Sequence, residues 1–445
     1  MELKSLVKKY NVPGPRYTSY PTVPYWKDEQ LSENQWLNIL HQVTNQTVSI
    51  YIHLPFCEDL CTFCGCHKRI TKNHSVEGPY IDAVLTEWRL YKPHLPANLQ
   101  ISEIHLGGGT PTFFSPTQLK RLLLGITEGI DTTSCSMGFE AHPNNTTEEH
   151  LYTLNSLGFK RISFGIQDYN PGVQQAIHRI QTEHQVRNIH EKAKELGYSI
   201  NHDLVYGLPF QDLAALTNTL EITASMRPDR IALYSYAHVP WVKGTGQRGY
   251  QEADLPNEMV KMDCYEFATN FLIEQGYIPI GMDHFALPDD ELAIALNSGN
   301  LHRNFMGYTV QTSRTMIGLG MSAISDAWFG FAQNHKHVET YIEHVNRGEI
   351  PIFKGHILSE KDLEIRANIL ELMCHFTTQL PRNDQERAQV MAGLNPLEAD
   401  GIITIKQDIV RIQPAYRGFV RNVCMCFDAY LRSQPKKENT FSKTI

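Results

Sequence analysis

Three cysteines in one short segment are the residues of this 445-residue chain with the clearest chemical potential. Cys57, Cys61 and Cys64 follow the spacing C-x3-C-x2-C. Three thiolates this close can hold three corners of a four-iron cluster, because cysteine thiolate is the usual ligand of iron–sulfur centres. The fourth iron would have no protein ligand and would be open to a small molecule. The spacing therefore predicts a reactive [4Fe-4S] cluster.

A structural zinc site, or cysteines with no ligand at all, are the alternatives for this segment. Structural zinc takes four ligands, often from paired C-x2-C spacings, and Cys66 or His67 could complete such a set. A disulfide framework is not expected, because the nine cysteines are odd in number and unevenly spaced. In a reducing compartment such a cluster of thiols more often binds a metal.

A glycine run is the second motif that could bind a ligand. Gly107-Gly108-Gly109-Thr110-Pro111 follows the apolar segment 101–106. Glycines allow close approach of the backbone to a ligand, and exposed amides favour an anionic group. Glycine runs often only make turns, so this motif gains weight from its position near the cysteines.

Alternating strand and helix patterns position both motifs. Their order favours a parallel sheet with right-handed crossovers, curled into a full or partial barrel. In such barrels active-site residues lie at the carboxyl ends of the strands, where the cysteine segment, the glycine run, Glu140, Gln167 and Asp203 are found. The predicted strands are 48–54, 101–106, 136–140, 161–166, 200–206, 231–236 and 277–282. Helices are predicted at 80–91, from 115 onward, at 147–157, 171–177, 183–196 and 257–275, with another between 206 and 231.

Changes of pattern divide the chain into three parts. Residues 1–45 are expected to be an irregular arm that covers the site, because Pro13, Pro15 and Pro21 prevent a long helix. Residues 46–350 form the barrel. Residues 351–445 are expected to form a small helical domain with a β-wing, in which a helix at 363–376 is followed by short strands between 402 and 412.

Composition excludes several classes of protein. The chain has 40 basic and 48 acidic residues, a net charge of −8, which argues against a general nucleic-acid binder. No apolar run approaches the roughly 20 residues of a membrane helix, and the charged start lacks a signal peptide's apolar stretch. We therefore expect a cytoplasmic protein that binds neither nucleic acid nor membrane.

The cysteine and glycine motifs together resemble those of the radical S-adenosylmethionine (SAM) enzymes. Longer segments resemble one family among them, the oxygen-independent coproporphyrinogen III oxidases (coproporphyrinogen dehydrogenases), over nearly the whole chain. The segments that carry this resemblance are 10–22, 57–66, 165–170, 203–209, 236–238, 281–286, 301–305 and 421–428.

The resemblance implies a fold and a reaction. The fold is an α/β, TIM-like partial (β/α)6 barrel with an N-terminal arm and a small, mostly helical C-terminal domain. A [4Fe-4S] cluster reduces SAM, whose carbon–sulfur bond breaks to give a 5′-deoxyadenosyl radical. Hydrogen abstraction by this radical leads to oxidative decarboxylation of two propionates of coproporphyrinogen III to vinyl groups, which gives protoporphyrinogen IX in haem biosynthesis. The enzyme is expected to act as a monomer with an electron donor such as flavodoxin or ferredoxin.

The resemblance also assigns residues. Cys57, Cys61 and Cys64 match the cluster ligands, and Cys66 matches a cysteine implicated in catalysis that does not bind iron. The family binds two SAM molecules. Positions that match contacts to the first are Tyr51, Gly108, Glu140, Ala237 and Ile324. Those that match contacts to the second are Phe63, Gly109, Thr110, Gln167, Arg179 and Asp203.

Some positions depart from the family or have no assigned role. His142 and Met306 stand where the family often has aspartate and glutamine. Arg16, His302 and Arg303 are candidates to anchor a substrate with four propionates, because such a polyanion needs cationic partners.

Two other functions share part of this pattern. A haem chaperone with the same barrel would generally lack the cysteine equivalent to Cys66 and the proline-rich arm, and both are present here. A radical SAM enzyme that methylates and opens haem shares the cysteine loop and would consume haem.

Overall fold

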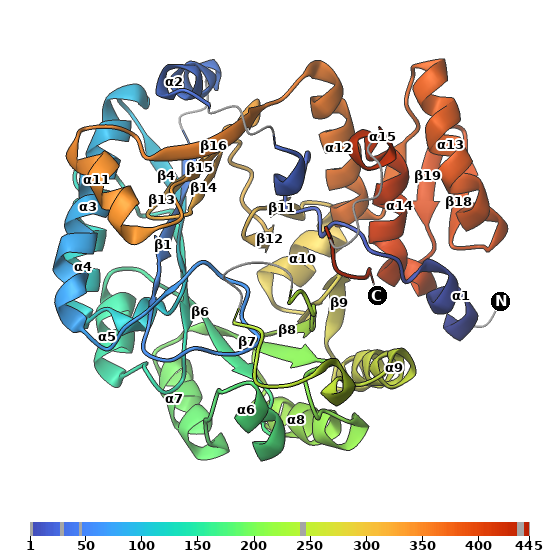
Figure 1. The fold of residues 1–445 in the computed structure, drawn as a ribbon, viewed down its shortest axis with the longest axis horizontal. Helices are drawn as coiled ribbons and strands as arrows, with labels where there is room; N and C mark the ends of the chain where they lie inside the picture. The colour runs from blue at the N-terminus through green and yellow to red at the C-terminus, as the bar shows by residue number, and fades with distance from the viewer. Residues whose placement is uncertain (1–2, 27–30, 44–46, 241–245, 434–439, 445) are drawn as a thin grey trace.

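A twelve-stranded sheet forms the body of the protein and curls into a partial barrel (Figure 1). The computed structural model describes residues 3–26, 31–43, 47–240, 246–433 and 440–444. Six consecutive neighbours of the sheet pair in parallel, which confirms the predicted (β/α)6 arrangement. They are β1 (Thr47–Leu54), β4 (Gln100–Gly108), β5 (Ser136–Ala141), β6 (Arg161–Gln167), β7 (Ser199–Tyr206) and β8 (Arg230–Ser235).

Helices cover the outer face of this sheet (Figure 1). Several begin at a side-chain cap: Thr147 and Thr182 each accept a hydrogen bond from the backbone three residues on, which stabilises a helix start. The covering helices are α3 (Glu77–Tyr91), α4 (Pro116–Thr127), α5 (Glu148–Ser156), α6 (Pro171–Ala176), α7 (Glu183–Glu195), α8 (Leu213–Met226) and α9 (Glu258–Glu274).

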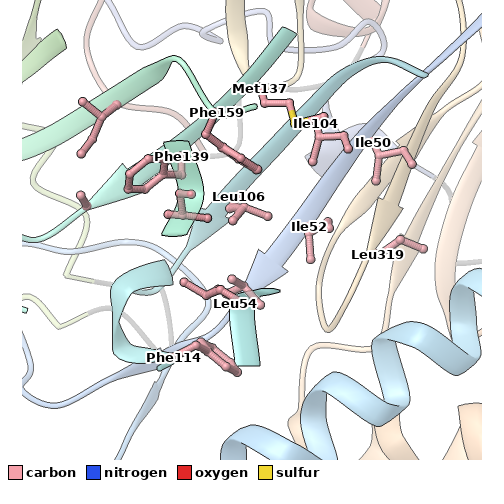
Figure 2. Packing of buried hydrophobic residues seen from close by; sticks show 14 of the residues in the cluster. Ile50, Ile52, Leu54, Ile104, Leu106, Phe114, Met137, Phe139, Phe159 and Leu319 are labelled. Carbon is pink, nitrogen blue, oxygen red and sulfur yellow. The ribbon is translucent and has the colours of Figure 1, made fainter. Parts of the chain in front are cut away.

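Side chains alternate along the parallel strands between the helix-covered core and the barrel interior. Ile50, Ile52 and Leu54 of β1 are fully buried in the core, as Figure 2 shows beside Leu106 and Phe139 of the neighbouring strands. The residues between them face the other side, because successive side chains of a strand point to opposite faces. Polar residues at these alternate positions therefore gather inside the barrel.

The strands after β8 depart from the parallel series. The predicted strand at 277–282 is β9 (Ile278–Gly281), which pairs with β10 (His284–Ala286), and β10 runs antiparallel to β8. On the opposite edge β13 (Met316–Leu319) pairs in parallel with β1. Antiparallel strands β14 (Ile324–Asp326), β15 (Gly330–Asn334) and β16 (Ile352–Ile357) extend that edge. These short strands lack the regular strand–helix alternation that revealed the others, and the sheet continues beyond the proposed boundary at 350.

Between the two edges lies an insertion with a short hairpin. It consists of α10 (Glu291–Ser298), β11 (His302–Asn304) and β12 (Gly307–Thr309), and β11 pairs with β12 in antiparallel fashion. Helix α11 (Val338–Asn346) connects β15 to β16.

The N-terminal segment is more regular than expected. The prediction of an irregular arm is wrong for α1 (Leu3–Tyr10) and α2 (Glu33–Gln42), two short helices that lie on either side of the prolines. Lys9 Nζ and the Tyr10 hydroxyl donate hydrogen bonds to Asp400 at 2.5 and 2.6 Å, so α1 packs on the C-terminal domain (Figure 1). The proposed boundary at 45/46 lies outside the described residues.

A separate apolar core organises the C-terminal domain. Ser359 caps α12 (Glu360–His375), as its sequence predicts, and the strands β18 (Ile403–Lys406) and β19 (Ile409–Ile412) form the expected wing. Cys424 is fully buried in this core. The remaining elements are β17 (Thr377–Gln379), α13 (Asp384–Ala399), α14 (Val420–Phe427) and α15 (Ala429–Ser433). In the part of the chain that the structure describes, no helix has the length and apolar character needed to cross a bilayer.

Candidate active site

The three motif cysteines line a cavity of about 550 Å³ at the carboxyl ends of the parallel strands. We call it the thiol cavity. All but three of the predicted site residues line it. Those that line it are Cys57, Cys61, Phe63, Cys64, Cys66, Gly108, Gly109, Thr110, Glu140, Gln167, Arg179 and Asp203. Residues up to 146 positions apart in the sequence therefore share one space, as the barrel prediction requires.

The cysteine loop is held against the glycine run by close backbone contact. Two short strands, β2 (Phe56–Cys57) and β3 (Arg69–Ile70), pair at the base of the loop. The Gly109 N–H donates to the Leu54 carbonyl at 2.9 Å, and a Cβ at Gly109 would lie 2.5 Å from the carbonyl oxygen of Pro55. Only glycine fits this approach, which explains why Gly109 directly follows the end of β4 at Gly108.

Polar donors point at the cysteine sulfurs. Thr110 Oγ1 donates to Cys57 Sγ at 3.4 Å, and Arg179 Nη1 donates to Cys61 Sγ at 3.5 Å. Lys68 Nζ donates to two carbonyls of the loop at 3.3 Å. Such donors favour thiolate over thiol and stabilise the negative charge of a cluster held by thiolates. The residues present therefore fit a [4Fe-4S] cluster.

The alternative of a structural zinc site is not supported by the arrangement of the side chains. Among the residues that the structure describes, no three His, Cys, Asp or Glu side chains are arranged to hold a single metal ion. All nine cysteines are free thiols.

Glu140, on β5, presents an ionised carboxylate to the thiol cavity. Its oxygens accept a hydrogen bond from the Gly108 N–H at 3.2 Å and lie 3.7 Å from His105 Nε2. Burial opposes ionisation, but the hydrogen bond and charge of His105 and the Gly108 amide together hold the pKa of Glu140 below its usual value. This carboxylate can accept hydrogen bonds from a ligand's ammonium or hydroxyl groups.

Asp203, on β7, is a second carboxylate in the cavity with a different environment. It accepts from Ser163 Oγ at 2.9 Å and from Asn201 Nδ2 at 2.8 Å. Burial raises the pKa of Asp203 to about 6. Ser163 and Asn201 were not predicted as site residues, although both fall on lumen-facing positions of their strands by simple alternation.

Arg179 and His142 also line the thiol cavity. Arg179 Nε donates to the Gly165 carbonyl at 3.1 Å, which fixes the guanidinium. His142 Nδ1 accepts from the Asn144 N–H at 3.1 Å. Burial, and then the charge of Arg179, lower the pKa of His142 to about 2. The departure at this position therefore places a neutral ring beside the arginine.

Tyr51, on β1, lies outside the thiol cavity but is tied to it through His53, a strand-end residue for which no contact was predicted. The Tyr51 hydroxyl lies 3.1 Å from His53 Nδ1, and His53 Nε2 lies 2.8 Å from the His67 carbonyl. The carbonyl can only accept, so Nε2 carries the proton and Nδ1 accepts from Tyr51. The ring of His53 also occupies the space that a Cβ at Gly108 would need. Its place at a strand end beside Cys57 was the available signal.

Two further predicted SAM contacts are not brought to the thiol cavity. The Ala237 carbonyl accepts from Gln247 Nε2 at 2.7 Å, and the same amide reaches the Phe63 carbonyl at 3.4 Å, so Ala237 is one residue removed from the cavity wall. Ile324, on β14, packs with an apolar group that includes Trp26 and Phe331.

The proposed substrate anchors are scattered. Arg16 forms an ion pair with Asp283 and lies over the ring of Tyr234. His302 and Arg303 line a different cavity, behind the β11–β12 hairpin. Met306, at the tip of that hairpin, lines the barrel lumen.

Comparisons with known proteins agree with this site. A family model described as the radical SAM superfamily matches residues 51–222. A protein from Synechocystis named oxygen-independent coproporphyrinogen III oxidase is 38% identical, covering 99% of this chain and 97% of its own length. Its counterpart from Escherichia coli is 36% identical, covering 99% and 98%.

A solved structure has the same fold. That of the Escherichia coli coproporphyrinogen III oxidase, described as a radical SAM enzyme, superimposes with a TM-score of 0.90 at 35% identity. The match covers 96% of this chain and 99% of that one. Radical SAM chemistry implies the [4Fe-4S] cluster and SAM as cofactors, and the alternatives based on haem are not favoured. From its thiol cavity, its fold and these whole-chain similarities, the chain belongs to the oxygen-independent coproporphyrinogen III oxidase family of the radical SAM superfamily.

Proposed function

We propose that the protein converts coproporphyrinogen III to protoporphyrinogen IX by oxidative decarboxylation of two propionates to vinyl groups, without oxygen, in haem biosynthesis. The observation that carries this proposal is the thiol cavity, in which residues from the five parallel strands β4 to β8 meet the three cysteines. The similarity to relatives of that name along nearly the whole chain supports the choice of substrate.

Different residues of the thiol cavity would hold the cluster and stabilise its ligands. Cys57, Cys61 and Cys64 would hold the cluster, and Thr110 and Arg179 would donate to its sulfur ligands. When bound, the cluster and SAM supply a one-electron reduction that ends in hydrogen abstraction from the substrate.

We infer that two SAM molecules bind, one for each group of predicted contacts. The different settings of Glu140 and Asp203 support two sites, because one carboxylate is held ionised by His105 and the other is held by neutral donors. Arg179, a predicted contact of the second SAM, is a cation suited to a ligand carboxylate. Tyr51, Ala237 and Ile324, predicted contacts of the first SAM, lie outside the thiol cavity and would reach that ligand only from beyond the cavity wall.

Cys66 is proposed as a catalytic residue that does not bind iron. It lines the thiol cavity two residues after the third cluster cysteine, and Lys68 Nζ donates to its carbonyl at 3.3 Å. Cys66 is therefore part of the cavity wall, and its backbone carbonyl is held by Lys68. A thiol there can pass a proton or a hydrogen atom to or from the substrate.

The remaining requirements concern partners and domains. Each turnover needs electrons from outside, which we assign to a small redox protein such as flavodoxin or ferredoxin, acting on a cytoplasmic monomer. The chain's net charge of −8 gives no reason to expect nucleic acid as a partner. The arm is proposed to cover the site, because Arg16 reaches Asp283 beside β10.

An anaerobic assay tests the proposed reaction. Reconstituted protein would be incubated with SAM, a strong reductant and coproporphyrinogen III, and products followed by chromatography. Protoporphyrinogen IX should form together with 5′-deoxyadenosine, and Cys66→Ser should abolish the porphyrin product while the cluster stays bound. Cleavage of SAM without a porphyrin product would contradict the substrate assignment. Consumption of haem in a parallel incubation, with haem in place of coproporphyrinogen III, would favour the haem-degrading alternative.

A further inference from the structure

A second cavity lies behind the β11–β12 hairpin, away from the cysteines. It has a volume of about 470 Å³ and is bounded by β11, the segment 311–314 and helix α12. We call it the hairpin cavity. In Figure 1 the hairpin lies between the barrel and the C-terminal helices. None of the predicted cofactor contacts lines it.

The hairpin cavity adjoins the reaction chamber through the barrel lumen. The lumen holds a space of about 140 Å³ that shares Glu140 and Asp203 with the thiol cavity. On its other side the lumen is closed by the hairpin, and Asn304 lines both the lumen and the hairpin cavity. The two spaces therefore meet at Asn304 of the hairpin.

Arg303 brings an uncompensated charge to this cavity. Its Nε and Nη1 are buried, and neither has a hydrogen-bond partner among the described residues. The guanidinium lies 4.6 Å from the ring centre of Tyr308, whose hydroxyl is fixed by donating to the Met373 carbonyl at 3.0 Å. Burying guanidinium nitrogens without hydrogen-bond partners is costly, so an acceptor or counter-charge in the cavity would stabilise Arg303.

Several other charged residues that line the hairpin cavity do have partners, unlike Arg303. Arg366 also lines the cavity but is paired with Asp326 at 2.5 Å. Glu371, the other carboxylate of the lining, accepts from Thr378 Oγ1 at 2.7 Å. Arg314, exposed at the mouth, lies 4.9 Å from the ring centre of Trp328 and has no carboxylate partner within the described chain.

We propose that the hairpin cavity receives a propionate of the tetrapyrrole that does not react, with Arg303 as its main contact and Arg314 as a weaker one. This inference rests on the proposed function. Two of the four propionates must reach the thiol cavity, whereas the other two remain charged and still need cationic partners. An arginine suits a carboxylate because it offers several N–H donors in one plane. The inference assigns a distinct place to a carboxylate that survives the reaction.

The test compares porphyrin binding by the cluster-loaded enzyme and by Arg303→Gln. Coproporphyrin III, an oxidised analogue that does not react, and its tetramethyl ester would be titrated while protein fluorescence is followed. We expect the variant to bind the tetraacid at least about 10-fold more weakly, which is about 1.4 kcal/mol, and to bind the ester as the wild type does. Arg314→Gln should weaken binding of the tetraacid about 3-fold. Arg121→Gln, at an exposed position of α4, serves as the matched control.

The outcomes separate this inference from the proposed function. Equal weakening of acid and ester in Arg303→Gln, or none, would overturn the inference, whether or not the wild type forms protoporphyrinogen IX. In turnover the same variant should raise KM with little change in kcat, because the contact is the same in ground and transition states. A wild-type enzyme that neither binds coproporphyrin III nor converts the substrate would overturn both. The thermal midpoint of the variant should equal or exceed that of the wild type, because it loses an unpaired charge.

Discussion

The upper and lower ends of the barrel lumen are built by the same strands but treat their charges differently. At the floor, Arg161 meets Glu103 at 2.6 Å, and Arg230 meets Asp290 and Glu291 at 2.7 and 2.8 Å. At the thiol cavity, Glu140 and Asp203 are held by hydrogen bonds to neutral groups or a histidine, and neither is paired with Lys or Arg within the described residues.

Within one sheet, the end with paired charges therefore serves stability and the end with unpaired charges serves ligand binding. Charges that already have opposite partners stabilise the floor and offer nothing to a ligand. Charged groups without an opposite partner at the carboxyl ends of the strands can bind a ligand. This is expected of a barrel in which function lies at that end. The unpaired Arg303 follows the same logic outside the lumen.

The largest expected effect is on the cysteines of the upper end. Cys61→Ser should lose the iron–sulfur absorption and lower activity by at least ~10³-fold, about 4 kcal/mol in the barrier, because a cluster ligand is gone. Iron content and product formation after anaerobic reconstitution measure this. Cys135→Ser, a thiol outside the thiol cavity, should keep both. Full iron content and activity in Cys61→Ser would remove the basis of the comparison.

Substitutions at the floor should lower stability and leave the chemistry of the thiol cavity nearly unchanged. Arg161→Met leaves the buried Glu103 without its cation, and breaking a buried pair in this way costs about 3–5 kcal/mol. The urea midpoint of unfolding should fall, while SAM cleavage per folded molecule stays near the wild-type value. The double variant with Glu103→Gln should recover much of the stability. Loss of SAM binding at unchanged stability would show instead that the floor acts on the ligand.

Glu87, a buried carboxylate behind the sheet, allows a test by pH of what a buried acid without a cationic partner does to stability. It accepts from Gly320 N–H, Asn334 Nδ2 and the Tyr341 hydroxyl but has no cationic partner in the described structure. Burial raises its pKa to about 7.

The sign of the pH effect follows from the raised pKa of Glu87. The folded state binds the proton more tightly than the unfolded state, so the stabilisation is complete below the ordinary pKa of 4.5 and is lost as pH rises through 7. Unfolding midpoints should fall by the equivalent of about 2 kcal/mol between pH 5 and pH 8. Glu87→Gln should remove this slope, whereas the exposed Glu339→Gln should retain it. A slope unchanged in Glu87→Gln would refute the assignment.

The smallest effect compares two residues on one face of β1. Tyr51→Phe removes the hydroxyl that donates to His53 and should weaken SAM binding about 5-fold, near 1 kcal/mol. Ser49→Ala, two residues toward the floor, loses its contact with Ser102 and should leave SAM affinity unchanged. Equilibrium dialysis of SAM against the cluster-loaded variants distinguishes the two. Equal weakening would mean that the whole strand, rather than its upper end, determines binding.

Much of the site could be predicted because its signals are local. The cysteine spacing and the glycine run are each a few residues long, and the period-two pattern of β5, β6 and β7 places Glu140 and Asp203 on the lumen face. The parts that were missed depend on distant partners. The role of His53 requires the loop to return at His67, and the helices α1 and α2 are short segments whose stability comes from packing.

The sequence by itself determined the (β/α)6 order, the cysteine loop and the carboxyl-end placement of the candidate ligands, because these follow from chain periodicity and residue chemistry. Tertiary structure alone decided which charges are satisfied. Arg16, Arg161, Arg303 and Arg366 look alike in the sequence, yet three meet a carboxylate and Arg303 does not. Pairing depends on which distant segments fold together, and a charge left without a partner is the one available to a ligand.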